Sequence, residues 1–215
     1  MEFYALLPSF GEHDIVHSAI PEGAEILELG CGAGRMTHPL IDLGHPIACV
    51  DNSPEMLAHV RGAETICADI EGLDLGRTFP VVLLASHLVN TAEQRQRRAF
   101  LEACARHIEP GGSILIQRAD PSRGWEPGTE SDSIVHGVRI QTRVLSRLGT
   151  VISAQGNYTI GDRTWTHAYR SEILDDEAFG RALELSALTL ASWLDESRTW
   201  ARAVRAEPGK DRSRS

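Results

Sequence analysis

Residues 26–34 read Ile-Leu-Glu-Leu-Gly-Cys-Gly-Ala-Gly. The apolar residues at the start are typical of a strand buried on both faces, as in a parallel sheet covered by helices. The three glycines at alternate positions allow a sharp turn and let a ligand approach bare backbone. Because Arg35 to Thr37 then begin a helix, the stretch predicts a strand, a ligand-binding turn and a helix.

The charge next to this glycine loop indicates which ligand it binds. A dinucleotide site has Gly-x-Gly-x-x-Gly spacing and places a pyrophosphate at the helix N-terminus, whereas this loop has Gly-x-Gly-x-Gly and follows Glu28. Two like charges about 4 Å apart repel by about 4 kcal/mol at an effective dielectric constant near 20. A helix dipole stabilises an anion at the helix N-terminus by only about 0.3–1 kcal/mol. Glu28 therefore favours a ligand with an ammonium group, such as S-adenosylmethionine.

The length and charge of the chain limit the kinds of protein it can be. Its 215 residues predict one domain over residues 1–206, followed by a disordered tail at 207–215. The net charge of −9 disfavours a nucleic-acid partner. We find no signal peptide, no apolar membrane span and no metal-ligand spacing, so we expect a cytoplasmic protein with no membrane partner and no metal site.

Strands alternate with helices along the first half of the chain, which predicts a doubly wound parallel sheet. Pro39 stands inside the helix expected at 35–43, so that helix should start late or bend. Thr91 and Gln94 are expected to form a capping box for a helix that runs to His107. The further strands are expected at residues 46–51, 64–69, 79–86 and 113–119.

Asp51 lies at the carboxyl end of the second expected strand, 23 residues after Glu28 in the sequence. An acid at this place binds ribose hydroxyls in nucleotide-binding βαβ units. The alternative is that Asp51 only caps the next helix, but Ser53 followed by Pro54 already provides a cap. We therefore interpret Asp51 as a ribose-binding residue.

Four ordered motifs carry a resemblance to a known family: residues 28–34, 50–56, 68–70 and 109–113. Together they resemble class I S-adenosylmethionine-dependent methyltransferases. The resemblance implies a Rossmann-like seven-stranded sheet in the order 3-2-1-4-5-7-6 with strand 7 antiparallel. It places Glu28 near the methionine ammonium, Asp51 at the ribose and Asp69 at the adenine amine. The other candidate cofactor contacts in these segments are Gly30, Gly32, Gly34, Asn52, Met56, Ile70 and Ser86.

Residues after 120 show the alternation of antiparallel strands, expected at 138–148, 151–160 and 164–173. They predict an extra three-stranded sheet inserted at about 134–173. On its third strand, Trp165, His167 and Tyr169 share one face. The sheet resembles one that lines the acceptor pocket in small-molecule members of the family; a packing face or a homodimer contact is the alternative. Asp175 is expected to cap a helix through Ala187, before a final hairpin.

Methyl transfer from a sulfonium is an in-line displacement, and a base is needed only where the acceptor is protonated. His87, at the tip of the fourth strand, is the candidate base or acceptor-positioning residue, and Asn90 and His167 are further catalytic candidates. The alternative for His87 is a hydrogen bond within its loop. Tyr4 and Phe10 either fold over a ligand or pack on the first helix.

The sequence thus predicts a methyltransferase with a small-molecule acceptor. Residues 85–88 lack the Asp/Asn-Pro-Pro-Tyr/Phe motif of enzymes that methylate nucleobase amines. An enzyme acting on RNA or protein, or a non-catalytic regulator that binds S-adenosylmethionine, are the alternatives.

Overall fold

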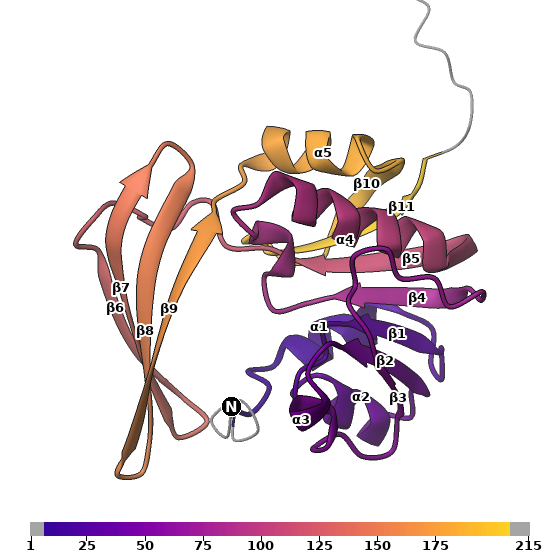
Figure 1. Ribbon diagram of the computed structural model, residues 1–215, viewed down its shortest axis with the longest axis horizontal. Helices are drawn as coiled ribbons and strands as arrows, with labels where there is room; N and C mark the ends of the chain where they lie inside the picture. Colours follow the sequence, from indigo (N-terminus) through magenta and orange to yellow (C-terminus); the bar gives the residue numbers. More distant parts are fainter. Residues whose placement is uncertain (1–6, 207–215) are drawn as a thin grey trace, which may run out of the picture.

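A seven-stranded sheet forms the larger part of the computed structural model (Figure 1), which describes residues 7–206. The expected tail at 207–215 and Tyr4 lie outside the described residues. The strands are β1 (Ile26–Leu29), β2 (Ile47–Asp51), β3 (Glu64–Cys67), β4 (Phe79–Leu84), β5 (Ile108–Gln117), β10 (Leu188–Trp193) and β11 (Trp200–Arg205). Their order is β3-β2-β1-β4-β5-β11-β10, and β11 is antiparallel to β5. The predicted order and the antiparallel last strand are confirmed.

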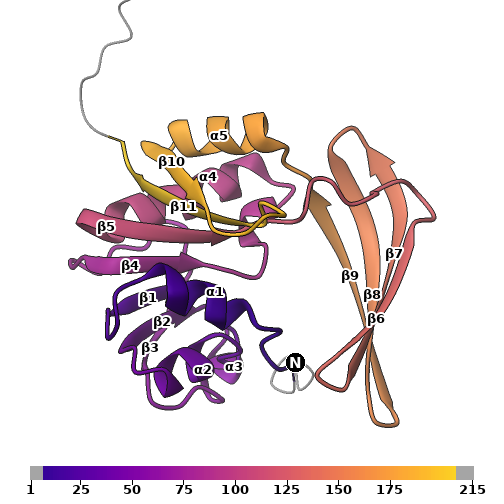
Figure 2. The same cartoon turned by 180° about the vertical axis from the view of Figure 1, so that it is seen from behind.

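Helices cover both faces of this sheet. They are α1 (Glu12–Ala19), α2 (Thr37–Asp42), α3 (Pro54–Leu57), the 3-10 helix η2 (Leu88–Asn90), α4 (Gln94–His107) and α5 (Asp176–Glu184). On one face, Leu27 and Leu29 pack in a core with Phe100 of α4 and Phe179 of α5. On the other, Ile26 packs in a second core with residues of α1, α2 and α3. Figures 1 and 2 show α4 and α1 on opposite sides of the sheet, as a doubly wound fold requires.

Two helix starts show how the local sequence acts. Helix α2 begins at Thr37, so Pro39 falls in its first turn, where a proline is tolerated. The expected late start is confirmed. The prediction of a capping box is wrong, because Gln94 is itself the first residue of α4. Thr91 Oγ1 instead donates to Gln96 Oε1 over 2.7 Å. The preceding turn η2 moves the helix start beyond the reach of the box.

The inserted sheet has four antiparallel strands, not the three predicted. They are β6 (Glu130–Val135), β7 (Val138–Leu148), β8 (Val151–Ile160) and β9 (Arg163–Glu172), paired in that order. The three predicted strands are confirmed, and β6 is the addition. It was missed because nearly all of its residues are polar or exposed, so they carry no burial alternation. A two-residue turn at His136 and Gly137, both at positive φ, joins it to β7.

The insertion sheet is attached to the large sheet near the end of β4. Asn90 Nδ2 donates to the Glu172 carbonyl over 2.8 Å, and Asn90 Oδ1 accepts from the Ala119 amide over 2.7 Å. Glu172 also forms a 2.5 Å ion pair with Arg97 of α4. The insertion follows β5, so it stands beyond the carboxyl ends of the parallel strands (Figure 2). It therefore faces the edge at which such sheets bind ligands.

The end of the chain completes the large sheet. Asp175 caps α5 by accepting from the Ala178 amide over 2.7 Å, as predicted, but α5 ends at Glu184 rather than at Ala187. Ala187 has a φ of 56°, which turns the chain into β10. None of the helices within residues 7–206 has the length and apolar character needed to cross a membrane.

Candidate cofactor and active site

The glycine loop after β1 is open to a ligand at its middle position. Gly30, Gly32 and Gly34 all have left-handed φ values, of 75°, 56° and 88°. A Cβ at Gly30 would lie 2.5 Å from Leu88 Cδ1, and one at Gly34 would lie 2.7 Å from His38 Cε1. At Gly32 a Cβ would meet nothing within 4 Å. The outer glycines face the side chains of Leu88 and His38, whereas the backbone at Gly32 borders free space.

Asp51, at the carboxyl end of β2, is fixed against this loop. Its Oδ2 accepts from the Gly32 amide over 2.8 Å, and its Oδ1 accepts from the Ser53 amide over 2.9 Å. Ser53 Oγ in turn caps α3, as predicted. Asp51 is half-buried, and each carboxylate oxygen can accept a further hydrogen bond. The carboxylate is therefore held in one orientation with acceptor capacity left for a ligand.

The neighbouring strand ends add polar and apolar groups. Asn52 Nδ2 donates to Asp69 Oδ1 over 2.8 Å, and both residues are exposed. Ile70 lies against the loop, with its Cδ1 3.5 Å from where a Gly30 Cβ would stand. Met56 is half-buried on α3. Asp51 and Asp69 thus lie at the ends of adjacent strands, next to the apolar side chains of Ile70 and Met56.

Glu28 lies beneath the loop, buried, and its Oε2 accepts from Thr37 Oγ1 over 2.7 Å. Desolvation raises the pKa of Glu28 to about 7, although the Thr37 hydrogen bond and the charge of Arg35 lower it. Near neutral pH this carboxyl is therefore divided between its two protonation states.

Ser86 and His87 form a strained turn at the end of β4. Their φ values are 56° and 58°, which side chains of this kind rarely adopt. The Ser86 amide donates to Gln117 Oε1 over 2.8 Å, which helps to hold the turn. Such strain occurs preferentially at functional sites. His87 retains exposed surface, but enough protein surrounds it that desolvation lowers its pKa, and the charge of Arg35 adds to this effect. Its imidazole is neutral at neutral pH.

Arg35 is a site residue that the sequence reasoning missed. Its Nη1 donates to Glu12 Oε1 of α1 over 2.8 Å, and its Nη2 donates to Ser86 Oγ over 3.2 Å. The guanidinium stands 5.9 Å from the ring centre of Phe10, which thus packs beside the glycine loop. The available signal was a basic residue directly after the loop, but its partners come from distant parts of the chain.

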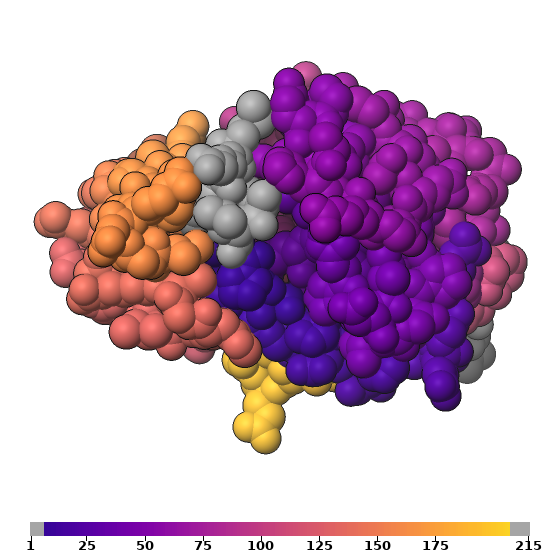
Figure 3. All heavy atoms as spheres, turned by 90° about the horizontal axis from the view of Figure 1, so that it is seen from below, coloured from indigo at the N-terminus to yellow at the C-terminus, as the bar shows by residue number. Residues whose placement is uncertain are grey.

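The inner face of the insertion sheet carries aromatic residues. Trp165, His167 and Tyr169 share this face as predicted, and the His167 and Tyr169 rings stack 5.9 Å apart. Tyr158 lies opposite Trp165 in the register. Desolvation raises the pKa of Tyr158 while the charge of Arg35 lowers it, so this face lies within electrostatic reach of the glycine loop. In Figure 3 the sheet borders the indigo first residues of the described chain.

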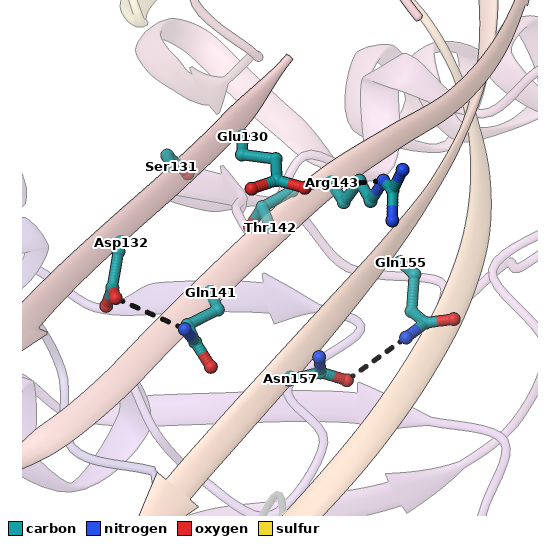
Figure 4. A pocket seen from close by; sticks show the side chains of 8 residues that line it. All are labelled: Glu130, Ser131, Asp132, Gln141, Thr142, Arg143, Gln155 and Asn157. Carbon is teal, nitrogen blue, oxygen red and sulfur yellow. Dashed lines mark hydrogen bonds and ion pairs between the residues drawn. The ribbon is translucent and has the colours of Figure 1, made fainter. Parts of the chain in front are cut away.

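The other face of the insertion sheet is polar. It carries a hollow of about 380 Å³ whose lining side chains pair with one another, such as Gln141 with Asp132 and Gln155 with Asn157 (Figure 4). This hollow is on the side away from His167 and Tyr158, so we do not place the site there. Among residues 7–206, no three His, Cys, Asp or Glu side chains gather as a metal site would require.

Comparison with known proteins agrees with this geometry. A family model described as a methyltransferase domain matches residues 26–112. This match supports the resemblance of the chain to class I S-adenosylmethionine-dependent methyltransferases. The chain is 30% identical to a cypemycin N-terminal methyltransferase of a Streptomyces species, over 54% of its own length and 50% of the relative's length. The chain is 29% identical to a dTDP-3-amino-3,4,6-trideoxy-alpha-D-glucopyranose N,N-dimethyltransferase of Streptomyces venezuelae. That match covers 68% of this chain and 62% of the relative.

A solved structure extends the likeness to the whole fold of the chain. CalS10, an amino pentose methyltransferase from Micromonospora echinaspora, superposes with a TM-score of 0.73 at 22% identity, over 95% of both chains. The chain spans only about half to two thirds of the length of the two curated relatives. The likeness to the solved structure therefore shows the fold.

Proposed function

We propose that the protein transfers a methyl group from S-adenosylmethionine to an amine of a small molecule. One observation carries the proposal: the carboxylate of Asp51 is fixed against the open backbone of Gly32, at the carboxyl edge of the sheet. A carboxylate at this place can accept hydrogen bonds from the ribose hydroxyls of a nucleoside. The relatives whose names specify amine acceptors support the choice of nitrogen.

The residues fit this cofactor as follows. Asp51, with Asn52 beside it, binds the ribose hydroxyls, and Asp69 accepts from the adenine amine. Ile70 and Met56 flank the adenine ring. The glycines at 30, 32 and 34 let the ligand lie against backbone, and Ser86 contacts its methionine end. Glu28 stabilises the ammonium from beneath the loop, because it is buried and negatively charged when ionised.

The cofactor, when bound, supplies an electrophilic methyl group on a sulfonium. The acceptor amine must lose a proton before it attacks, since an ammonium has no free electron pair. His87 is neutral at neutral pH and accepts that proton. S-adenosylmethionine held by Asp51 and Asp69 would supply the methyl group to that nitrogen.

The insertion sheet forms the acceptor side of the site. His167 and its stacked neighbour Tyr169 face inward and orient the acceptor. Asn90 acts through the backbone: it links the end of β9 to the segment after β5 and so positions the sheet. We keep Asn90 as a positioning residue rather than a proton carrier, because its amide already bonds to backbone groups on both sides.

The remaining expectations stay predictions. The net charge of −9 is the reason to expect no nucleic-acid partner. A cytoplasmic location and a homodimer also remain predictions from the sequence alone. A methyltransferase that acts on RNA or protein, and a non-catalytic regulator, remain the alternatives, but no contact in the site favours them.

A methyl-transfer assay tests the proposal. The protein is incubated with S-adenosylmethionine labelled in its methyl group and with a panel of amino sugars and other small amines. Label should pass to an amine and S-adenosylhomocysteine should accumulate in equal amount. The matched control is Asp51→Ala, which should transfer far less at the same cofactor concentration. Label on RNA or protein alone, with none on any small molecule, contradicts the proposal.

A further inference from the structure

Arg123, on the acceptor side of the site, carries a charge that none of the contacts described so far uses. It lies in the segment that joins β5 of the large sheet to β6 of the insertion sheet. We propose that Arg123 binds an anionic group of the acceptor, so that the acceptor is a small amine that also carries a phosphate or a carboxylate. The proposal rests on the proposed function, because it narrows the class of acceptor for the same site.

The guanidinium of Arg123 is held by uncharged partners. Its Nη2 donates to Ser131 Oγ of β6 over 2.5 Å, and its central carbon lies 4.9 Å from the ring centre of Trp125. Within residues 7–206 it forms no ion pair with a carboxylate; the nearby Asp120 accepts from the amide and the hydroxyl of Ser122 instead. Arg123 is half-buried, so its remaining N–H donors stay open to a ligand. A fork of such donors suits phosphate and carboxylate groups.

Both partners place this guanidinium at the inner face of the insertion sheet. Trp125 is buried in the small core on that face, against which Tyr169 packs. Directly paired residues of neighbouring strands share a face. One row of such residues crosses the four strands and comprises Ser131, Thr142, Gly156 and His167. Ser131 belongs to the edge strand, so it also borders the outer hollow of Figure 4. Arg123 therefore extends the face that carries His167 and Tyr169.

The acids next to Ser131 belong to the opposite face. Glu130 and Asp132 alternate with Ser131 along β6, and they form ion pairs with Arg143 and Arg139 of β7. Their negative charges are therefore already balanced and face away from the acceptor. An anion bound at Arg123 thus meets little repulsion from β6.

The charge of Arg123 reaches the candidate catalytic groups. Desolvation and the charge of Arg35 lower the pKa of His87, and the charge of Arg123 lowers it further. Desolvation raises the pKa of Tyr169, whereas the charge of Arg123 lowers it. An acceptor whose anion binds Arg123 is thus held within reach of His87, which removes the proton from its amine.

The test compares amino sugars that differ in one anionic group: glucosamine, glucosamine 6-phosphate and muramic acid, which carries a carboxylate. Their dissociation constants are measured by calorimetry on the protein saturated with S-adenosylhomocysteine, and their kcat/KM values by methyl transfer from S-adenosylmethionine. The parent should favour at least one anionic sugar over glucosamine by roughly 10- to 150-fold, the range for hydrogen bonds to a charged group. A preference for only one of the two identifies the group as phosphate or carboxylate. Arg123→Met should remove the preference.

The controls separate this contact from folding and from the proposed function. Arg143→Met removes an exposed arginine from the outer face of the same sheet and should keep the parent preference. Arg123→Lys keeps the charge without the fork and should give an intermediate preference. The proposal is overturned if the parent binds neither anionic sugar or binds them no better than glucosamine, even if no Arg123 variant folds, and also if Arg123→Met keeps the preference. Methyl transfer to glucosamine without any preference leaves the proposed function intact, whereas transfer to no small amine contradicts the proposed function itself.

Discussion

At the level of single residues, the site works through charges that alter one another. Glu28, Asp51, Arg35 and His87 come from three strand ends and one loop, and two of them have pKa values shifted by burial. Burial disfavours the charged form of each group, so Glu28 resists ionisation and His87 resists protonation. These residues therefore offer direct tests by substitution and by pH.

Asp51→Ala should weaken the binding of S-adenosylmethionine by about 1.5–3 kcal/mol, the value of hydrogen bonds to a charged group. The effect corresponds to a loss of roughly 10- to 150-fold in affinity. Calorimetry measures it, with Asp14→Ala on the exposed side of α1 as the matched control. A change of less than about twofold in a folded Asp51 variant would mean that the carboxylate only holds the loop and α3.

Glu28 should make cofactor binding depend on pH. Because its pKa is about 7, the ionised form that attracts the ammonium is the minor form at about pH 6 and the major form at about pH 8. Affinity should rise roughly tenfold between these values in the parent and much less in Glu28→Gln. Calorimetric titrations at both pH values measure this.

The same residue should affect stability in the opposite direction. The pKa of Glu28 in the folded protein lies above its ordinary value of 4.5, so the folded state holds the proton more tightly. Its contribution to stability is then lost as the pH rises from about 4.5 to about 7. At about pH 8, Glu28→Gln should melt at a higher temperature than the parent although it binds the cofactor less well. A lower melting temperature would show that the charge is needed for folding.

His87→Ala should lower kcat by about 10²–10⁴-fold, the usual contribution of a general base, and should leave cofactor binding nearly unchanged. The neutral imidazole is the active form, so kcat should fall as the pH drops. Since its pKa is lowered from 6.5, this fall should begin at a more acidic pH than for an ordinary histidine. The measurement is kcat against pH for the parent, His87→Ala and His87→Asn. An unchanged profile in an active His87→Ala enzyme rules out the role of base.

At the level of elements, the attachment of the insertion sheet decides where its aromatic face lies. β9 ends at Glu172, which is bound through its backbone by Asn90 and through its side chain by Arg97. Both partners belong to the segment that follows β4 and carries His87. The acceptor face and the candidate base are therefore held by one local structure.

Removal of one partner of the ion pair between Arg97 and Glu172 should strongly reduce stability. The two side chains are only 7% and 13% exposed, so Arg97→Met leaves a buried carboxylate without its partner. The expected loss is about 3–5 kcal/mol in the free energy of unfolding. Arg98→Met, one residue along, breaks an exposed pair with Glu102 and should change it by less than about 1 kcal/mol. Urea unfolding measures the free energy of unfolding of both variants. Equal losses in Arg97→Met and Arg98→Met would contradict the account.

Elements with a clear burial pattern were predicted from the sequence, and those without it were not. β7, β8 and β9 alternate between a packed and a polar face, so three insertion strands were found. β6 has no buried residue and depends on pairing with β7, which sequence periodicity does not report. The site divides in the same way: Asp51 and the glycines belong to local motifs, whereas Arg35 acquires its role from Glu12, 23 positions away, and from Ser86.

At the level of the whole molecule, the two sheets contribute different parts of the candidate site. The large sheet presents the glycine loop and the acidic strand ends, and the insertion sheet turns its aromatic face toward them. The turn at the end of β4 carries His87 between these parts. The net charge of −9 disfavours a large anionic partner. This arrangement suits the transfer of a small group between two bound molecules.

The most direct test of the central claim is a calorimetric titration of the unmodified protein with S-adenosylmethionine and, separately, with NAD. Glu28 beneath a Gly-x-Gly-x-Gly loop favours a positively charged tail over a pyrophosphate. We predict saturable binding of S-adenosylmethionine at one site per chain and much weaker binding of NAD. Tighter binding of NAD than of S-adenosylmethionine would contradict the account.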